Sequence, residues 1–341
     1  MKNLSKTAKI LIVLAAAVLI ILAATVGAFF YYTSKLNIEV LGGEEGKGYF
    51  DMLKADKDAD GVTNILVIGA DNDVGSGMDA PGNGDGLVIV SVNNAKKQIT
   101  LTSLMRDTRV IKPSNGYATK LTLAYHDGGP ELLIECIESN MGIDIDNYVR
   151  VNYHDVVKII DAAGGVKVEL VEEEIEYMND KIEAVAKTVG ADWMGNKIPL
   201  DHTGTYKLNG VQAAGYMRVR VLEGDGDLGR TSRIRTILMG MKDNLRKMNL
   251  VQLGNFANVV LPCITTDMQQ DDIAQHLVKL SKYLKYDFVS NRIPADDTFY
   301  YSTDGHAYTM VDFEINREYF LNIVYTEQQK ANILASEAAE D

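Results

Sequence analysis

The chain has 341 residues, 46% hydrophobic and 24% charged, which is the composition of a globular protein with room for one large domain or two ordinary ones. Its net charge of -13 argues against a protein that wraps nucleic acid, because neutralising phosphates requires a basic face. We therefore expect no nucleic-acid partner.

The N-terminal residues are typical of a membrane anchor. Lys2, Lys6 and Lys9 precede an uncharged run, Ile10–Tyr32. With about 23 residues, this run can cross a hydrocarbon core of ~30 Å as a helix. The alternatives are a cleaved signal peptide, whose apolar core is shorter, and a buried core helix. Because the lysines come before the run, the positive-inside rule predicts a single-pass protein of the cell membrane, with its N-terminus in the cytoplasm and its bulk outside.

The remainder of the chain alternates between strand and helix patterns. The predicted strands are Asn64–Ile68, Leu87–Val92, Ile99–Leu104, Tyr148–Asn152, Val166–Leu170, Asp297–Ser302 and Tyr308–Phe313. The predicted helices are Pro130–Met141, His154–Ala163, Glu172–Val189, Asn209–Met217, Thr231–Met248 and Asp271–Leu284. This alternation favours an α/β or α+β layered fold, and the polar residues from Glu327 onward predict a frayed tail.

These patterns divide the chain into five parts. We expect a cytoplasmic N-terminus (1–9), a transmembrane helix (10–32), an extracytoplasmic linker (33–61), one folded domain (62–326) and a polar tail (327–341). The domain carries two cysteines, Cys136 and Cys263, whose spacing fits no metal motif. Outside the cytoplasm they are able to form a disulfide, and two separate buried thiols are the alternative.

An acidic, glycine-rich loop follows the first predicted strand. Asp71 opens this loop and Asp85 lies near its end. Carboxylates at strand ends beside flexible loops are well placed to hold a hard cation through oxygen ligands. An ordinary Asp/Gly turn is the alternative interpretation.

Two arginine-rich segments are candidates for binding phosphate. Arg106 and Asp107 come directly after the strand Ile99–Leu104, where a surface salt bridge is the alternative. Arginine suits phosphate because its planar fork donates two parallel hydrogen bonds. The second segment flanks a Gly-rich loop that contains Asp227, and its arginines are Arg218, Arg220, Arg230, Arg233 and Arg235. A solvated helix face would account for Arg233 and Arg235, but less well for the others.

Several catalytic motifs are missing from the sequence. There is no Walker phosphate loop, no Gly-x-Ser-x-Gly and no His-Glu-x-x-His, and the five histidines are scattered. A nucleotide-driven kinase or a Ser/His hydrolase is therefore disfavoured.

Taken in order, the motifs resemble one known family. They read NILVIGAD, DGLVIVSVN, ITLTSLMRDTRV, YVRVNYHDVVKIIDAAGGVKVEL, LNGVQAAGYMRVR and GDLGRTSRIRTIL. Together they resemble the LytR–CpsA–Psr family, over a best-matching core of about 64–238. The resemblance implies a central mixed β-sheet flanked by helices, with an apolar pocket for a polyprenyl chain. It also implies a phosphotransferase that moves a glycopolymer (teichoic acid, capsule or a related wall polysaccharide) from a polyprenyl-pyrophosphate carrier to peptidoglycan.

The same resemblance assigns roles by position. Asp71 and Asp85 resemble cation-binding aspartates for Mg²⁺ (or Mn²⁺). Arg106 and Asp107 match an Arg-Asp pair in which Arg106 also contacts the pyrophosphate, and either Asp107 or Asp71 is the catalytic base. Arg218, Arg220 and Arg230 match arginines that hold the pyrophosphate, and Asp227 matches a supporting acid.

The chain departs from the family pattern near this site. Many members carry Arg where this chain has Asn72, Arg-Ser where it has Asn83-Gly84, Thr where it has Gly86, and Gln where it has Ile234. Arg233 or Arg109 is a candidate substitute for the missing arginines, and we include Arg233 among the residues expected to bind the pyrophosphate. The departures keep a second hypothesis open, a non-catalytic protein on the same fold that binds polyprenyl phosphate or the cell wall. A transcriptional regulator is disfavoured by the export signal and the acidic charge.

Overall fold

A computed structural model of the chain describes residues 37–38, 61–71, 82–200, 203–220 and 226–340. The predicted transmembrane helix lies outside these ranges. Within them, none of the helices combines the length and the apolar character that crossing a membrane requires.

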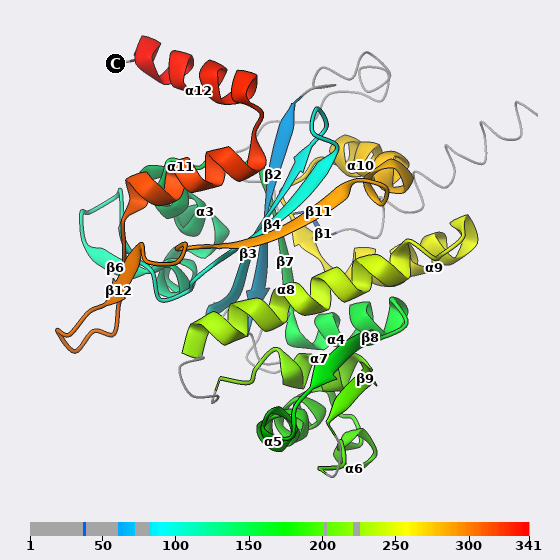
Figure 1. The fold of residues 1–341 in the computed structure, drawn as a ribbon. Helices are drawn as coiled ribbons and strands as arrows, with labels where there is room; N and C mark the ends of the chain where they lie inside the picture. The colour runs from blue at the N-terminus through cyan, green and yellow to red at the C-terminus, as the bar shows by residue number, and fades with distance from the viewer. Residues whose placement is uncertain (1–36, 39–60, 72–81, 201–202, 221–225, 341) are drawn as a thin grey trace, which may run out of the picture.

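A seven-stranded mixed sheet forms the centre of the molecule (Figure 1). In spatial order its strands are β1 (Asn37–Ile38), β10 (Thr265–Thr266), β7 (Asn147–Asn152), β2 (Val62–Ala70), β3 (Gly84–Asn93), β4 (Gln98–Leu104) and β11 (Asp287–Ile293). The strands β2, β3 and β4 form an antiparallel meander, whereas β7 and β11 pair in parallel with β2 and β4. Three two-stranded sheets pair β5 (Arg109–Ile111) with β6 (Ala118–Lys120), β8 (Val166–Leu170) with β9 (Gly204–Leu208), and β12 (Phe299–Tyr301) with β13 (Thr309–Val311).

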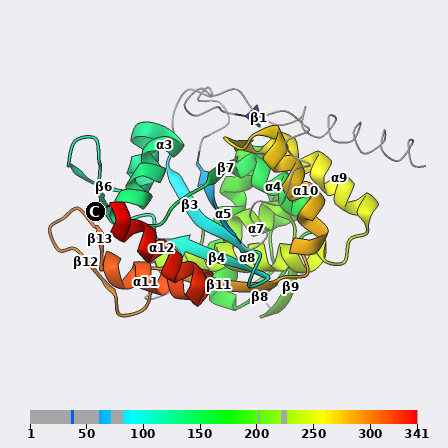
Figure 2. The ribbon, with the colours of Figure 1, turned by 90° about the horizontal axis from the view of Figure 1, so that it is seen from above.

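Helices cover both faces of the central sheet (Figure 2). One face packs against α3 (Leu121–Met141) and α11 (Phe313–Val324), and α12 (Glu327–Glu340) follows α11. The remaining helices lie on the other face of the sheet or in the lobe at the bottom of Figure 1. They are α4 (Tyr153–Ala162), α5 (Glu172–Val189), α6 (Trp193–Asn196), α7 (Gly210–Tyr216), α8 (Gly226–Leu245), α9 (Leu250–Val260) and α10 (Gln270–Tyr283), with a 3₁₀ turn at Leu261–Cys263. The predicted layered fold is thus confirmed.

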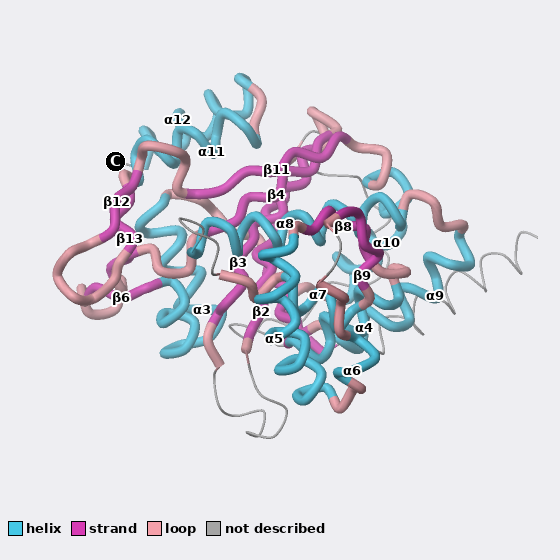
Figure 3. The backbone as a smooth tube through the Cα atoms, turned by 60° about the horizontal axis from the view of Figure 1, so that its bottom comes forward, coloured by secondary structure: helices cyan, strands magenta, loops and turns pink. Residues whose placement is uncertain are grey.

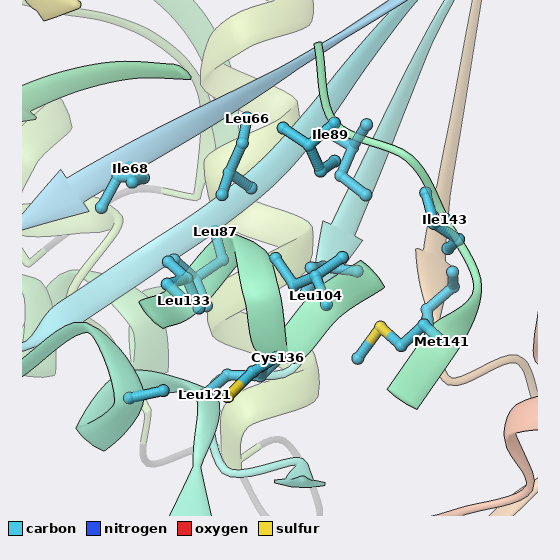
Figure 4. Close-up of a cluster of buried hydrophobic side chains, with 14 of the residues drawn as sticks. Leu66, Ile68, Leu87, Ile89, Leu104, Leu121, Leu133, Cys136, Met141 and Ile143 are labelled. Atoms are coloured by element: carbon cyan, nitrogen blue, oxygen red, sulfur yellow. The ribbon is translucent and has the colours of Figure 1, made fainter. Parts of the chain in front are cut away.

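The main core lies between the sheet and α3. Leu66 and Leu87 project from neighbouring strands toward Leu133 of α3, and each of the three side chains is fully buried or nearly so (Figure 4). Alternation explains this arrangement, since every second residue of β2 points to the same face. Burying a leucine stabilises the fold by roughly 1.5–3 kcal/mol, so this layer holds the site-bearing strand ends in place.

A second core builds the lower lobe in Figure 1. Apolar residues of α5, including Ile175, Met178 and Ile182, pack with those of α4, α7 and β8. Gly215 of α7 permits the close approach of α5, because a Cβ there would lie 2.7 Å from Cγ1 of Ile182. This lobe carries the chain from the sheet to the start of α8.

Most predicted elements are present, with shifted ends. The structure begins α8 at Gly226 rather than at Thr231, and α3 starts well before Pro130, with a kink at Gly128 and Gly129. The sequence patterns missed β11, α9 and α11. The edge strand β11 carries polar residues, so it lacks the apolar run on which strand prediction depends.

The prediction of a frayed tail is wrong, because residues 327–340 form α12. Thr326 and Gln329 make reciprocal hydrogen bonds that cap the first turn of this helix, with distances of 2.8 and 3.3 Å. Ile333 packs against the main core. The Thr-x-x-Gln pattern was the sequence signal for this helix start.

Cys136 and Cys263 are both free and buried, so the structure favours two separate thiols over a disulfide. Burial raises the pKa of each thiol to about 11. We therefore expect neither cysteine of the folded protein to react with iodoacetamide at pH 7.5 within an hour, because thiolate is the reactive form. Mass spectrometry checks this, with full labelling of both after denaturation as the control. A disulfide or rapid native labelling would contradict the structure.

Candidate functional site

The predicted site residues converge at one edge of the central sheet. Asp71 directly follows β2, Asp85 lies at the start of β3, and Arg106 and Asp107 follow β4. These positions meet because β3 runs antiparallel to both β2 and β4. The first turns of α8, with Asp227 and Arg230, pass the same edge (Figure 3).

A β-bulge aims Asp85 out of the strand ladder. Gly69 pairs with Gly86 and Ala70 pairs with Gly84, so Asp85 has no partner on β2. Such an extra residue bends the strand and redirects its side chain, and bulges are frequent next to active sites. The flanking glycines also leave room for neighbours, since a Cβ at Gly84 would lie 3.2 Å from Cβ of Tyr125.

Asp85 lies at the centre of a guanidinium cluster, formed by Arg106, Arg220 and Arg230. Its Oδ2 accepts from Nη2 of Arg230 at 2.6 Å and lies 3.7 Å from Nη2 of Arg220, and its Oδ1 accepts from Nη1 of Arg106. The Arg230 side chain is 2% exposed and the Asp85 side chain 11%, whereas Arg220 is 41% exposed. Burial alone would raise the pKa of Asp85, but Arg230 and Arg106 outweigh it and hold the pKa below its ordinary value. One carboxylate therefore faces three cations.

Asp107 and Asp227 hold Arg106 from the other side. Nε of Arg106 lies 3.7 Å from Oδ1 of Asp227 and 3.8 Å from Oδ2 of Asp107, and its backbone N–H donates to Asp227 Oδ2 at 3.2 Å. Lys120 adds a further cation, with Nζ 3.1 Å from Oδ1 of Asp107. In the described part of the chain, the cluster thus brings three acids together with Arg106, Arg220, Arg230 and Lys120.

Burial raises the pKa of Asp227, and Asp107 adds to this rise, although Arg230 and Arg106 partly offset it. An acid whose native pKa is raised gives stability that is present below its ordinary pKa of 3.8 and lost as the pH rises through the native value. In the Asp227→Asn variant the side chain cannot ionise, so the variant does not lose this stability as the pH rises. We therefore expect the free energy of unfolding of the variant to increase relative to that of the parent protein between pH 4 and pH 7, as measured by urea titrations.

Asp243→Asn is the matched control for this pH dependence, because the Asp243 side chain on the same helix is 59% exposed. Its stability relative to the parent should change little over the same range. A difference between Asp227→Asn and the parent that is constant with pH would contradict the raised pKa.

Not every predicted residue joins the cluster. Arg233 is buried against α5, where its Nη2 lies 3.1 Å from Oε1 of Glu174 and its Nη1 donates to the Val219 carbonyl at 3.1 Å. Asp71 closes the base of its loop, since its Oδ1 accepts from the Asn83 backbone N–H at 2.6 Å. Arg218 follows α7 at the edge of the undescribed residues 221–225, and Asn72 lies among the undescribed residues 72–81.

Sequence reasoning missed Lys120 and Tyr301. Lys120 ends β6 and reaches Asp107, and no motif surrounds it. Partial burial and the charges of Asp227 and Asp107 raise the pKa of Tyr301 of β12. Thr309 of β13 ties that hairpin to the site, since its backbone N–H donates to the Asp107 carbonyl at 2.9 Å.

An apolar cavity of about 250 Å³ lies next to Arg230. Arg230 forms part of its wall, and the sheet, α4 and α8 supply the rest. Its other lining residues are almost all aliphatic: Val67, Gly69, Ala70, Gly86, Val88, Val149, Val151, Asn152, Val156, Ile159, Ile160, Met217, Ile234, Ile237, Leu238, Met241 and Ile264.

A second apolar cavity of about 420 Å³ continues the first. The two share four lining residues, Val67, Leu238, Met241 and Ile264. The second lies between the sheet, the C-terminal half of α8 and α10. The predicted apolar pocket therefore corresponds to two neighbouring cavities that share part of their lining, and the first of them borders Arg230.

Two of the departures from the family pattern touch each other in this cavity. A Cβ at Gly86 would lie 3.3 Å from Cδ1 of Ile234, so the Ile234 side chain occupies the space above the glycine. Both residues line the first cavity. The chain thus has an apolar Gly–Ile contact at the two positions where Thr and Gln are common, which extends the apolar wall toward Arg230.

The arginine cluster and the apolar cavity define a class of α/β proteins that is suited to an amphipathic anion. The charged head of such a ligand would lie at the arginines and its apolar tail in the cavity. The chain belongs to the LytR_cpsA_psr family, whose model matches residues 33–319. That match is wider than the core recognised from the motifs.

Known relatives and solved structures agree with this assignment. The chain is 29% identical over 251 residues to a polyisoprenyl-teichoic acid–peptidoglycan teichoic acid transferase TagU from Enterococcus faecalis, covering 73% of this chain and 74% of the relative. It is 31% identical over 195 residues to biofilm regulatory protein A of Streptococcus mutans, covering 55% of this chain and 44% of that protein. A structure of TagT with bound octaprenyl pyrophosphate shares the fold, with a TM-score of 0.58, 18% identity, and 84% of this chain and 98% of that one covered.

Proposed function

We propose that the protein is a phosphotransferase that moves a glycopolymer (teichoic acid, capsule or a related wall polysaccharide) from a polyprenyl-pyrophosphate carrier to peptidoglycan. The observation that carries this proposal is the position of Arg230, which pairs with Asp85 in the cluster and also forms the wall of the apolar cavity. A ligand that fills both places needs an anionic head joined directly to a long apolar tail. The name of the Enterococcus faecalis relative supports the same reaction.

The reaction is a phosphoryl transfer. A sugar hydroxyl of peptidoglycan attacks the phosphorus that carries the glycopolymer, the P–O bond to the second phosphate breaks, and polyprenyl phosphate leaves. In this proposal Arg106, Arg220 and Arg230 stabilise the negative charge on the two phosphates, and such electrostatic stabilisation is usually the largest single contribution of a preorganised site. Asp107 or Asp71 accepts the proton of the hydroxyl.

We include a divalent cation, Mg²⁺ or Mn²⁺, in this proposal. The donor set fits by its chemistry, because Asp71 and Asp85 are carboxylates at adjacent strand ends, and Mg²⁺ commonly takes one or two carboxylates plus waters and phosphate oxygens. No cluster of three or more possible ligands occurs among the described residues. When bound, the cation would neutralise charge on the pyrophosphate. Asp71 and Asp85 would hold the cation, and Arg106, Arg220 and Arg230, which surround Asp85, would hold the pyrophosphate.

The location and the partners belong to the same proposal. The apolar run Ile10–Tyr32 would anchor the chain in the cell membrane, with the catalytic domain (62–326) outside, where both the lipid carrier and peptidoglycan are found. Because a polyprenyl donor is itself held in the bilayer, anchoring keeps enzyme and donor in the same two-dimensional phase.

The test uses the full chain in detergent with Mg²⁺, a short-chain polyprenyl-pyrophosphate glycan and peptidoglycan fragments. Mass spectrometry should find a phosphate-linked glycan on peptidoglycan, and this product should disappear with Arg106→Ala and with a chelator. Arg317→Ala is the matched control, because Arg317 pairs with Glu337 away from the cluster and its loss should leave the rate unchanged.

The second candidate function is a non-catalytic carrier-binding protein. The apolar Gly86–Ile234 contact favours it, since two polar groups common in the family are absent at the cavity mouth. Donor that binds in the cavity yet never turns over, with Mg²⁺ or Mn²⁺ present, would select this alternative and rule out the transferase.

A further inference from the structure

Helix α9 is apolar but none of its residues is buried. It spans Leu250–Val260 and has no charged residue. Leu250 is 79% exposed and Val251 is 73% exposed, which places them among the most exposed large apolar side chains of the described residues. A helix of a soluble globular protein normally turns such residues toward a core. One side of α9 contacts α4, whereas Leu250 and Val251 at its start form an apolar surface that the rest of the fold does not cover.

Helix α10 carries a further exposed apolar residue. Val278 of α10 is 81% exposed, and α10 lies on the same side of the molecule as α9 (Figures 1 and 3). The neighbouring Leu277 and Leu280 line the second cavity. Leu245 and Leu261, which flank α9 in the chain, line the same cavity. The exposed apolar face therefore borders the far end of the cavity system, opposite the arginines.

Exposed bases border this face in an otherwise acidic chain. Arg246, Lys247, Lys282 and Lys285 are all exposed. Residues 243–287 contain five Asp and, with Lys279, five basic residues, so this segment is neutral whereas the whole chain carries a net charge of -13. Exposed apolar side chains next to basic ones are the composition of surfaces that bind anionic bilayers, because the apolar groups enter the interface while the bases face the lipid head groups.

The chain also enters the fold at this side. The strand β1 pairs with β10, and α10 begins four residues after β10. Residues 1–36, which precede β1, include the long apolar run Ile10–Tyr32. A membrane anchor in that run would hold β10 and α10 close to the bilayer surface.

We propose that α9 and the outward side of α10 dock on an anionic phospholipid bilayer, and that the gap bordered by Leu245, Leu261 and Leu277 is the portal through which the polyprenyl tail passes between the bilayer and the cavities. This inference rests on the proposed function for the identity of the tail. The docking itself does not depend on catalysis. The arrangement keeps the tail out of water, since it moves directly from lipid into an apolar channel that ends at the guanidinium cluster.

Docking is tested with the full chain reconstituted in phosphatidylglycerol–phosphatidylcholine vesicles that contain brominated acyl chains. Trp193 is the only tryptophan, so Trp193→Phe provides a silent background. In it, Val251→Trp should be quenched by the brominated lipid at least about threefold more than Val171→Trp, because interfacial apolar side chains reach the acyl boundary. Val171 is the matched control, an exposed valine at the start of α5. Equal quenching at both positions would overturn the docking.

The portal is tested with the Leu250→Glu/Val251→Glu double variant and two donors. The rate with a long-chain donor held in the vesicles should fall about tenfold, as expected when charged side chains weaken docking, while the rate with a short-chain donor supplied from water stays unchanged. An equal fall with both donors, or no fall with either, would overturn the portal. If the parent protein turns over neither donor, the proposed function has failed, and the quenching experiment still decides the docking.

Discussion

Replacing Arg230 with methionine is expected to destabilise the fold by about 3–5 kcal/mol, because it removes the most deeply buried of the three cations that neutralise Asp85. Arg230 is almost fully buried and donates to Asp85 at 2.6 Å. The transfer rate should fall by roughly 10²–10³, the usual effect of removing one donor that faces developing charge. Urea titration and single-turnover assays at low temperature measure the two effects.

Two further variants separate stability from catalysis. Adding Asp85→Asn to Arg230→Met should restore most of the lost stability, because no unpaired buried charge remains, but it should not restore the rate. Arg233→Met removes another buried arginine, whose partner is Glu174, and should lower the stability while largely keeping the rate. A rate loss at Arg233 as large as that at Arg230 would place Arg233 at the pyrophosphate, as the sequence analysis predicts.

Leu238→Trp is expected to abolish tight binding of long polyprenyl pyrophosphates. Leu238 lines both cavities, so a larger side chain there would close the junction between them. At about 0.8 kcal/mol per CH₂ group, excluding only four such groups lowers the affinity by about 200-fold. A donor whose tail ends within the first cavity should bind as before. Calorimetry with donors of increasing tail length measures the difference.

The control for this prediction is Met194→Trp, which adds the same bulk at an exposed position of α6. It should change the affinity for neither donor. A Leu238→Trp variant that binds long and short donors equally well would show that the tail does not run through the two neighbouring cavities.

Local patterns predicted most elements because their signals lie in neighbouring residues. The apolar run before Gly69 defines a buried strand, and the Gly164-Gly165 pair ends the helix α4. Where the signal was not local, prediction failed. The strand β11 is specified by its pairing with β4, which lies far away in the chain. The helix α12 was missed although its signal is local, because a single Thr-x-x-Gln pair is a weak indication of a helix start.

The sequence by itself determined which residue types gather for the chemistry: acids after β2 and in β3, and arginines after β4 and in α8. Only the tertiary structure decided how they are paired. The strand order and the bulge at Asp85 bring Arg106, Arg220 and Arg230 to one carboxylate. Arg233 lies on α8, as Arg230 does, but its side chain turns toward Glu174.

The cavities and the apolar face of α9 were likewise decided by the tertiary structure. Val, Ile and Leu have the same composition whether they fill a core, line a channel or face a bilayer, so their sequence pattern does not distinguish these places. What distinguishes them is whether another element packs on the side chain. That depends on contacts between residues far apart in the chain, as where α8 and α10 stand away from the sheet and leave space between them.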